Sequence, residues 1–180
     1  MSGQYIKDSK IINTCFKTIF INLSTSKYID EIGKNPLVKV SRYFKILLKV
    51  IISLIKDNPK IIYLTITANG IGFYKDFPIA ILAKMFGKKL VLHYHNKGVI
   101  KNQHKPFDNL LYHVLFKNTK VILLSKYLYS DIIKYVKEED VYYCPNGIPE
   151  LSSEEKKKTN INDTVHLLFL SNLLKSKGVY

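Results

Sequence analysis

Two histidines separated by one residue are the side chains best suited to acid–base chemistry in this sequence. His93 and His95 flank Tyr94 at the end of an apolar run. Since successive side chains of a strand point to opposite faces, both imidazoles should share one face of a sheet. His95, at the strand end, would act as a proton shuttle or donate to a sugar or phosphate oxygen. The alternative, a structural histidine with satisfied hydrogen bonds, suits His93 better.

A zinc site is the metal-binding alternative for these histidines. Imidazoles at positions i and i+2 can share a metal, with His104 or His113 as a third ligand. The sequence places no carboxylate or thiol to complete such a site. We therefore expect no bound metal.

Two further patterns are incomplete as functional motifs. Gly70 and Gly72 follow an apolar run, as in a phosphate-binding turn, but the third glycine is missing, and a flexible turn is the alternative. Ser125 ends another apolar run outside any Gly-x-Ser-x-Gly elbow, which argues against a serine hydrolase. Its hydroxyl would instead bind a ligand or cap the next helix.

Residues 37–56 have the spacing of an amphipathic basic helix. Its cations fall on one stripe at about 100° per residue, and they are Arg42, Lys45, Lys49 and Lys56. The opposite side is apolar, with Val40, Phe44, Leu47, Ile51 and Leu54. Such a helix could face an anionic membrane. It could equally pack its apolar side on a sheet and expose its lysines to water.

A framework of alternating strands and helices would position these residues. Apolar runs predict strands at 18–23, 60–67, 89–95, 120–125, 141–144 and 165–171, and helical spacing predicts helices at 37–56, 77–86, 107–117 and 126–137. Continuous apolar strands separated by helices indicate a parallel sheet covered on both faces. We expect an α/β fold with a doubly wound, mostly parallel Rossmann-like sheet.

Length and composition are those of a globular chain. The sequence has 180 residues, 47% hydrophobic and 23% charged, enough for one domain and the start of another. Two cysteines cannot form a disulfide framework, and neither a signal peptide nor a membrane span is recognisable. We expect a cytoplasmic protein, peripheral at the inner face of the membrane if it binds lipid.

The net charge of +14 indicates a negatively charged partner, although a lysine-rich coding bias would produce the same excess. Arg42 is the only arginine among 28 basic residues. Because base readout and bidentate phosphate contacts favour the guanidinium group, we expect no sequence-specific binding of nucleic acid.

Residues 150–164 have no apolar periodicity and are rich in Ser, Glu and Lys, which is typical of a solvated linker. This divides the chain into a domain at 1–149 and the first strand of a second domain at 165–180. Alternatively, the last strand joins the same sheet and completes one domain.

Four segments, in this order and spacing, resemble the retaining glycosyltransferases of family 4: KLVLHYH at 89–95, VILLS at 121–125, VYYCPNGI at 141–148 and LLFLSNLLKSKG at 167–178. The resemblance implies a GT-B architecture. The first Rossmann-like domain receives the acceptor, and the second binds a nucleotide-diphosphate sugar. Catalysis takes place in the cleft between them, without a metal or other cofactor.

The resemblance also implies roles for individual residues. His95 matches the histidine beside the sugar, Lys177 matches the lysine that neutralises the donor diphosphate, and Gly3 ends the glycine-rich loop after the first strand. Asn172 stands where the family has an arginine. The first strand and most of the donor domain have no counterpart in this sequence, so we expect it to be a truncated acceptor half, inactive alone.

The implied function is transfer of a hexose from a nucleotide-diphosphate sugar to a glycan or lipid-linked acceptor, as in polysaccharide biosynthesis. The alternative is a non-catalytic basic α/β module that binds an anionic membrane surface. Turnover of a nucleotide sugar would favour the first, and salt-sensitive vesicle binding without turnover would favour the second.

Overall fold

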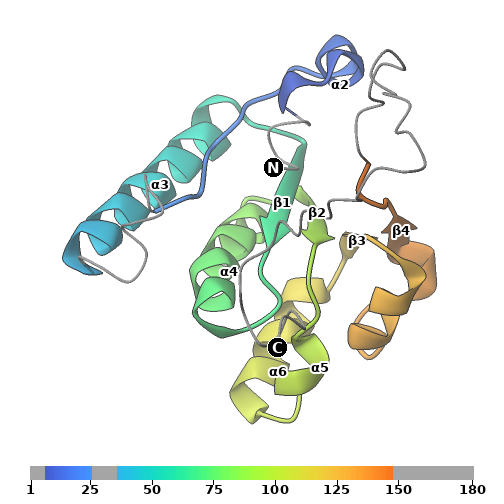
Figure 1. Ribbon diagram of the computed structural model, residues 1–180. Coiled ribbons are helices and arrows are strands. Elements are labelled where there is room, and N and C mark those ends of the chain that lie inside the picture. The colour runs from blue at the N-terminus through green and yellow to red at the C-terminus, as the bar shows by residue number, and fades with distance from the viewer. Residues whose placement is uncertain (1–6, 26–35, 148–180) are drawn as a thin grey trace, which may run out of the picture. The chain divides into compact units, whose positions relative to one another are not determined.

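A four-stranded, all-parallel sheet forms the framework of the computed structural model, which describes residues 7–25 and 36–147 (Figure 1). Its strands lie in chain order: β1 (Ile61–Ile66), β2 (Lys89–Tyr94), β3 (Thr119–Leu123) and β4 (Val141–Tyr143). Each coincides closely with a predicted strand. The expected parallel α/β architecture is thus confirmed, and the arrangement is compatible with a Rossmann-like fold.

Helices precede and connect these strands. They are α2 (Lys10–Cys15), α3 (Pro36–Lys56), α4 (Gly70–Met85), α5 (Val99–Asn102) and α6 (Pro106–Phe116), followed by the 3₁₀ helices η2 (Lys126–Asp131) and η3 (Glu138–Asp140). At the end of α4, Gly87 adopts φ +67°, and the amides of Gly87 and Lys88 donate to the carbonyls of Lys84 and Ala83. This is a Schellman cap, in which glycine is favoured because φ is positive.

The core lies between one sheet face and the helices α4 and α6. Alternate strand residues are buried there: Leu64, Ile66, Leu92, Tyr94, Val121 and Leu123. Phe73 of α4 and Tyr112 of α6 pack together with ring centroids 4.9 Å apart, and Phe116 stacks on Tyr94. The Tyr112 hydroxyl also donates to the carbonyl oxygen of Ala68, 2.8 Å away. Apolar burial and this bond together fix α6 against the end of β1.

The other sheet face differs from the prediction. Apart from buried His93, its side chains are half-buried or exposed: Tyr63, Val91, Ile122 and Tyr142 among them. Because the strands follow in consecutive order, right-handed crossovers bring α4 and α6 to the same face. Among the described residues the strand order does not reverse, so double winding and the GT-B arrangement stay predictions.

Three predicted elements need correction. Residues 18–23 do not form a strand, because no neighbouring strand pairs with them, although Ile21 and Leu23 pack against the core. The predicted helix 77–86 begins earlier, at Gly70, and holds Pro78 in its interior. Segment 126–137 forms a 3₁₀ helix and turns instead of an α-helix.

The second part of the chain stays a prediction. The described residues up to Asn146 belong to one compact unit. The expected linker at 150–164 and the expected strand at 165–171 lie outside the described residues. The domain division at 149 is therefore an expectation from sequence.

Candidate functional site

The carboxyl ends of the four parallel strands bring four chain segments to one edge of the sheet, where open α/β sheets bind ligands. The segments after β1 and β2 meet there. Asn69 Nδ2 donates to the Gly98 carbonyl oxygen, 3.3 Å away. A Cβ atom on Gly98 would lie only 2.3 Å from Asn69 Nδ2, so any larger residue here would displace the Asn69 side chain and break this hydrogen bond. The two loops thus form one closely packed unit.

Asp131 anchors the loop that follows β2. Its buried carboxylate accepts hydrogen bonds from the backbone amides of Gly98, Val99 and Ile100, at 2.8, 3.0 and 3.1 Å. These amides open α5, so the carboxylate satisfies donors that have no partner within the helix. This contact joins η2 to the loop next to His95. Asp131 is the last residue of η2 and is buried.

Asp76 anchors the loop that follows β1. Its carboxylate accepts from the amide and hydroxyl of Thr67, at 3.1 and 3.0 Å. Gly70 and Gly72, for which a flexible turn was the alternative to a phosphate site, form the first turn of α4 instead. Gly70 has φ +68°, the left-handed region that glycine enters without strain.

His93 and His95 share one sheet face, as their spacing predicts, and Tyr94 is buried on the other. Their ring centroids lie 4.2 Å apart. The Tyr63 hydroxyl and Nδ1 of His93 are hydrogen-bonded to each other. Nε2 of His93 is buried and has no hydrogen-bond partner in the described part of the chain. The expectation of satisfied hydrogen bonds at His93 thus holds for Nδ1 and not for Nε2.

Both imidazoles favour the neutral state. Burial, followed by the neighbouring charge of His95, lowers the pKa of His93 from 6.5 to about 4. Burial also lowers the pKa of His95 below its ordinary value. A neutral imidazole offers one N–H donor and one acceptor nitrogen. At pH 7, half-buried His95 has the hydrogen-bonding groups that a sugar hydroxyl requires.

The other predicted ligand-binding residues are only partly accounted for. Ser125 is half-buried after β3, at the same edge of the sheet, and its side chain does not cap η2. Gly3 and Lys177 lie outside the described residues. Within the described ranges, no three His, Cys, Asp or Glu side chains group as metal ligands.

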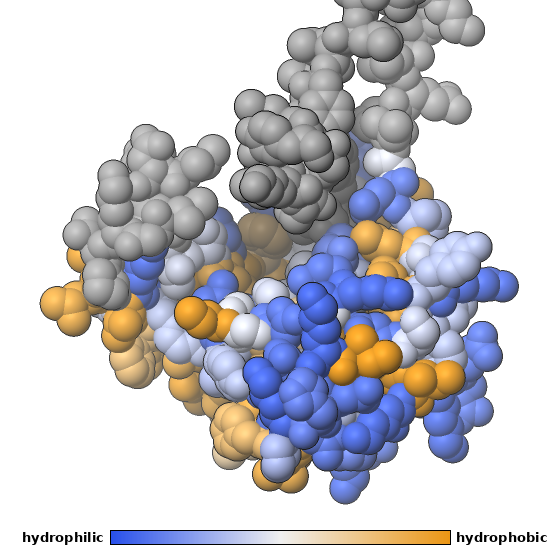
Figure 2. Space-filling view, turned by 60° about the horizontal axis from the view of Figure 1, so that its bottom comes forward, coloured by the Kyte–Doolittle hydropathy of each residue, from blue (hydrophilic) through white to orange (hydrophobic). Residues whose placement is uncertain are grey.

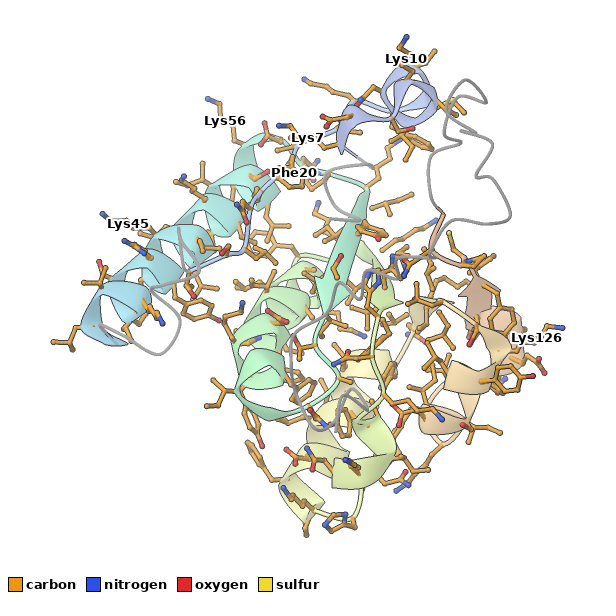
Figure 3. All side chains as sticks on the ribbon, viewed as in Figure 1. Lys7, Lys10, Phe20, Lys45, Lys56 and Lys126 are labelled. Atoms are coloured by element: carbon orange, nitrogen blue, oxygen red, sulfur yellow. The ribbon has the colours of Figure 1, made fainter. Side chains whose placement is uncertain are left out.

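The predicted basic stripe lies along α3. Lys45, Lys49 and Lys56 are exposed, and Figure 3 shows the labelled Lys45 and Lys56 pointing away from the sheet. Half-buried Arg42 donates from its guanidinium group to the Thr25 carbonyl oxygen, 3.1 Å away. None of the helices in the described segments is both long and apolar enough for a membrane crossing.

Tyr63, Asp76 and Asp131 belong to this site but carried no signal in the sequence. Asp131 accepts hydrogen bonds from amides more than 30 positions away in the sequence. Tyr63 of β1 is hydrogen-bonded to His93 of the neighbouring strand β2. Comparisons with protein-family models, with curated proteins and with solved structures find no match for this chain. The function is therefore inferred from the sequence and from the geometry of the site.

Proposed function

We propose that this chain is the acceptor-binding part of a retaining glycosyltransferase with GT-B architecture. It would help transfer a hexose from a nucleotide-diphosphate sugar to a glycan or lipid-linked acceptor. The observation that carries the proposal is the position of His95, half-buried at the carboxyl end of β2 in an all-parallel sheet. The order of the four sequence segments that resemble family 4 is its second support.

In this proposal His95 recognises the sugar as a neutral imidazole. A neutral imidazole can donate through its N–H or accept at its other nitrogen, which are the two interactions that a sugar hydroxyl makes. Asp131 and Asp76 act indirectly, because they hold the loops on either side of this position. Lys97, exposed two residues after His95, adds positive charge beside the leaving diphosphate.

The test is a transferase assay on the protein expressed from its complete natural gene. Radiolabelled UDP-glucose, UDP-galactose, UDP-N-acetylglucosamine and GDP-mannose are offered with a glycan and polyprenyl-lipid extract. We expect one donor to be consumed. We expect His95→Ala to lower its turnover about 30-fold, which corresponds to the loss of two hydrogen bonds of about 1 kcal/mol each.

His104→Ala is the matched control, because His104 is exposed in the segment between α5 and α6. It should turn over like the unmodified protein. Circular dichroism shows whether a His95 variant is folded. His95→Gln, which keeps a polar side chain, shows whether the lost turnover comes from the missing contact to the sugar. Unchanged turnover by His95→Ala, or no hexose transfer from any of the four donors, would overturn the proposal.

A further inference from the structure

Helix α3 leaves an apolar row exposed that its core contacts do not cover. Ile46, Val50 and Leu54 face inward and are buried. A second row lies about 80° or more around the helix from the centre of this buried face. Each of its side chains is at least 52% exposed: Leu37, Val40, Phe44, Leu48, Ile52 and Ile55. We call this row the outer apolar stripe.

The outer apolar stripe corrects the expectation for this helix. All five residues opposite the cations were expected to form one apolar side. Of these, Leu54 is buried and Leu47 and Ile51 are half-buried, whereas Val40 and Phe44 are exposed. The apolar surface of α3 is therefore wider than the neighbouring elements in the described structure can cover.

A basic row borders the C-terminal half of the outer apolar stripe. It consists of Lys45, Lys49 and Lys56, all exposed. Arg42 lies on the same side, with its guanidinium group bonded to Thr25. The sequence of α3 contains no acidic residue. Around its axis the helix thus presents a core side, an apolar side and a cationic side, in that order.

An apolar groove adjoins the stripe. It has a volume of about 460 Å³ and runs between α3 and α4, lined by Leu47, Ile51, Phe77, Pro78, Ile81 and Leu82. Leu47 and Ile51 lie between the buried side of α3 and the outer apolar stripe. Figure 2 shows apolar surface gathered on the side of the described unit where α3 and α4 lie. The groove and the stripe thus form one continuous apolar surface.

We propose that α3 docks this protein on an anionic lipid bilayer. The outer apolar stripe enters the boundary between headgroups and acyl chains, and the basic row lies on the lipid phosphates. A helix of 21 residues spans about 31 Å, and all of that length can contact the membrane plane. The groove beside the stripe receives an acyl chain.

Charge complementarity selects a bilayer over a second copy of the chain. A second copy would carry the same charge of +14 and, in a symmetric contact, would place the same lysines near their counterparts. An anionic bilayer instead offers uniform negative charge along the basic row. The proposal does not rest on glycosyltransferase activity, because vesicle binding is measured without a nucleotide sugar.

The first test is co-sedimentation with vesicles of phosphatidylcholine and phosphatidylglycerol at 7:3, compared with pure phosphatidylcholine. We expect binding to the anionic vesicles only, weakened by salt. Each lysine near the surface contributes about fivefold in affinity, so Lys45→Gln with Lys49→Gln should weaken binding about 25-fold. Lys101→Gln with Lys105→Gln makes the same charge change at exposed positions next to α6 and should leave binding within twofold.

The second test measures insertion directly. The sequence contains no tryptophan, so Leu48→Trp reports from the stripe alone. With anionic vesicles its emission should shift to the blue and be quenched by brominated lipid. Leu110→Trp is the matched control, because Leu110 is an exposed apolar residue of α6. It should show neither effect.

Three results would overturn the proposal. The first is no binding to anionic vesicles. The second is equal weakening by the two lysine pairs, or equal shifts at Leu48→Trp and Leu110→Trp, since general attraction would then explain binding. The third is a dimer in solution that Phe44→Ser with Leu48→Ser dissolves without vesicles, because the stripe would then be a self-association surface.

Discussion

His93 and His95 are the same residue type two positions apart, yet their surroundings differ. His93 is only 6% exposed and is bonded to Tyr63 across the strand pair, whereas His95 stands half-buried where β2 ends. The side chain of His93 lies within the sheet. Two residues further along, His95 lies at the edge formed by the carboxyl ends of the strands. Residue spacing therefore indicated which face they share, and position along the strand indicated their different burial.

The buried imidazole of His93 predicts a pH-dependent stability. Its pKa is about 4 in the folded protein, lowered from 6.5 by burial and His95, so the unfolded chain binds more protons between these values. The free energy of unfolding should decrease as the pH falls from 6.5 to 4. This group should contribute on the order of 3 kcal/mol to the decrease. Urea denaturation at a series of pH values measures it.

His93→Gln should remove this part of the pH dependence, because the amide does not titrate. His104→Gln, at an exposed position, should keep the slope of the unmodified protein. Identical slopes for His93→Gln and the unmodified protein would contradict the assignment.

At the scale of elements, the junction of β1 and α4 depends on close packing. A Cβ atom on Gly72 would lie 2.8 Å from both Cγ2 and Oγ1 of Thr67. Thr67 cannot easily move away, since Asp76 holds its amide and hydroxyl. The absence of a side chain at Gly72 thus lets the first turn of α4 pack closely against Thr67. The contact between Gly72 and Thr67 also helps to position the loop after β1, in which Asn69 bonds to Gly98.

Gly72→Ala is therefore expected to destabilise the protein. The overpacking costs about 1–3 kcal/mol, and the better helix propensity of alanine offsets up to about 1 kcal/mol of it. Chemical denaturation should show a net loss of about 1–2 kcal/mol in the free energy of unfolding.

Gly147→Ala is the matched control, because a Cβ atom there meets nothing within 4 Å. Its stability should stay within about 0.5 kcal/mol of the unmodified protein. A Gly72→Ala variant as stable as this control would show that the junction is looser than described.

On the scale of the whole molecule, uncompensated positive charge is the dominant electrostatic feature. The net charge is +14, and the ion pairs between described side chains include Lys75–Asp76, Lys120–Asp140 and Lys137–Glu139. The pairs Lys120–Asp140 and Lys137–Glu139 lie at the surface, where ion pairs contribute little to stability. Self-repulsion among the lysines should therefore destabilise the folded state at low ionic strength.

Raising NaCl from 20 to 500 mM should increase the melting temperature, since salt screens this repulsion. A relief of about 1 kcal/mol corresponds to roughly 2–4 °C for a chain of this size. Lys101→Glu with Lys105→Glu lowers the positive charge and should show a smaller rise in differential scanning calorimetry. A melting temperature that falls with added salt would contradict this account.

The sequence alone predicted the parallel strands β1 to β4 and the helices α3 and α6, because buried strands and amphipathic helices impose local apolar patterns. It also predicted that His93 and His95 share a face, since strand side chains alternate with period two. Only the tertiary structure decided what depends on distant neighbours. Asp131 reaches amides more than 30 positions away, residues 18–23 find no strand to pair with, and α4 covers only part of the apolar surface of α3. Local patterns record a residue's preference for burial, whereas contacts between distant segments determine which of those preferences the fold satisfies.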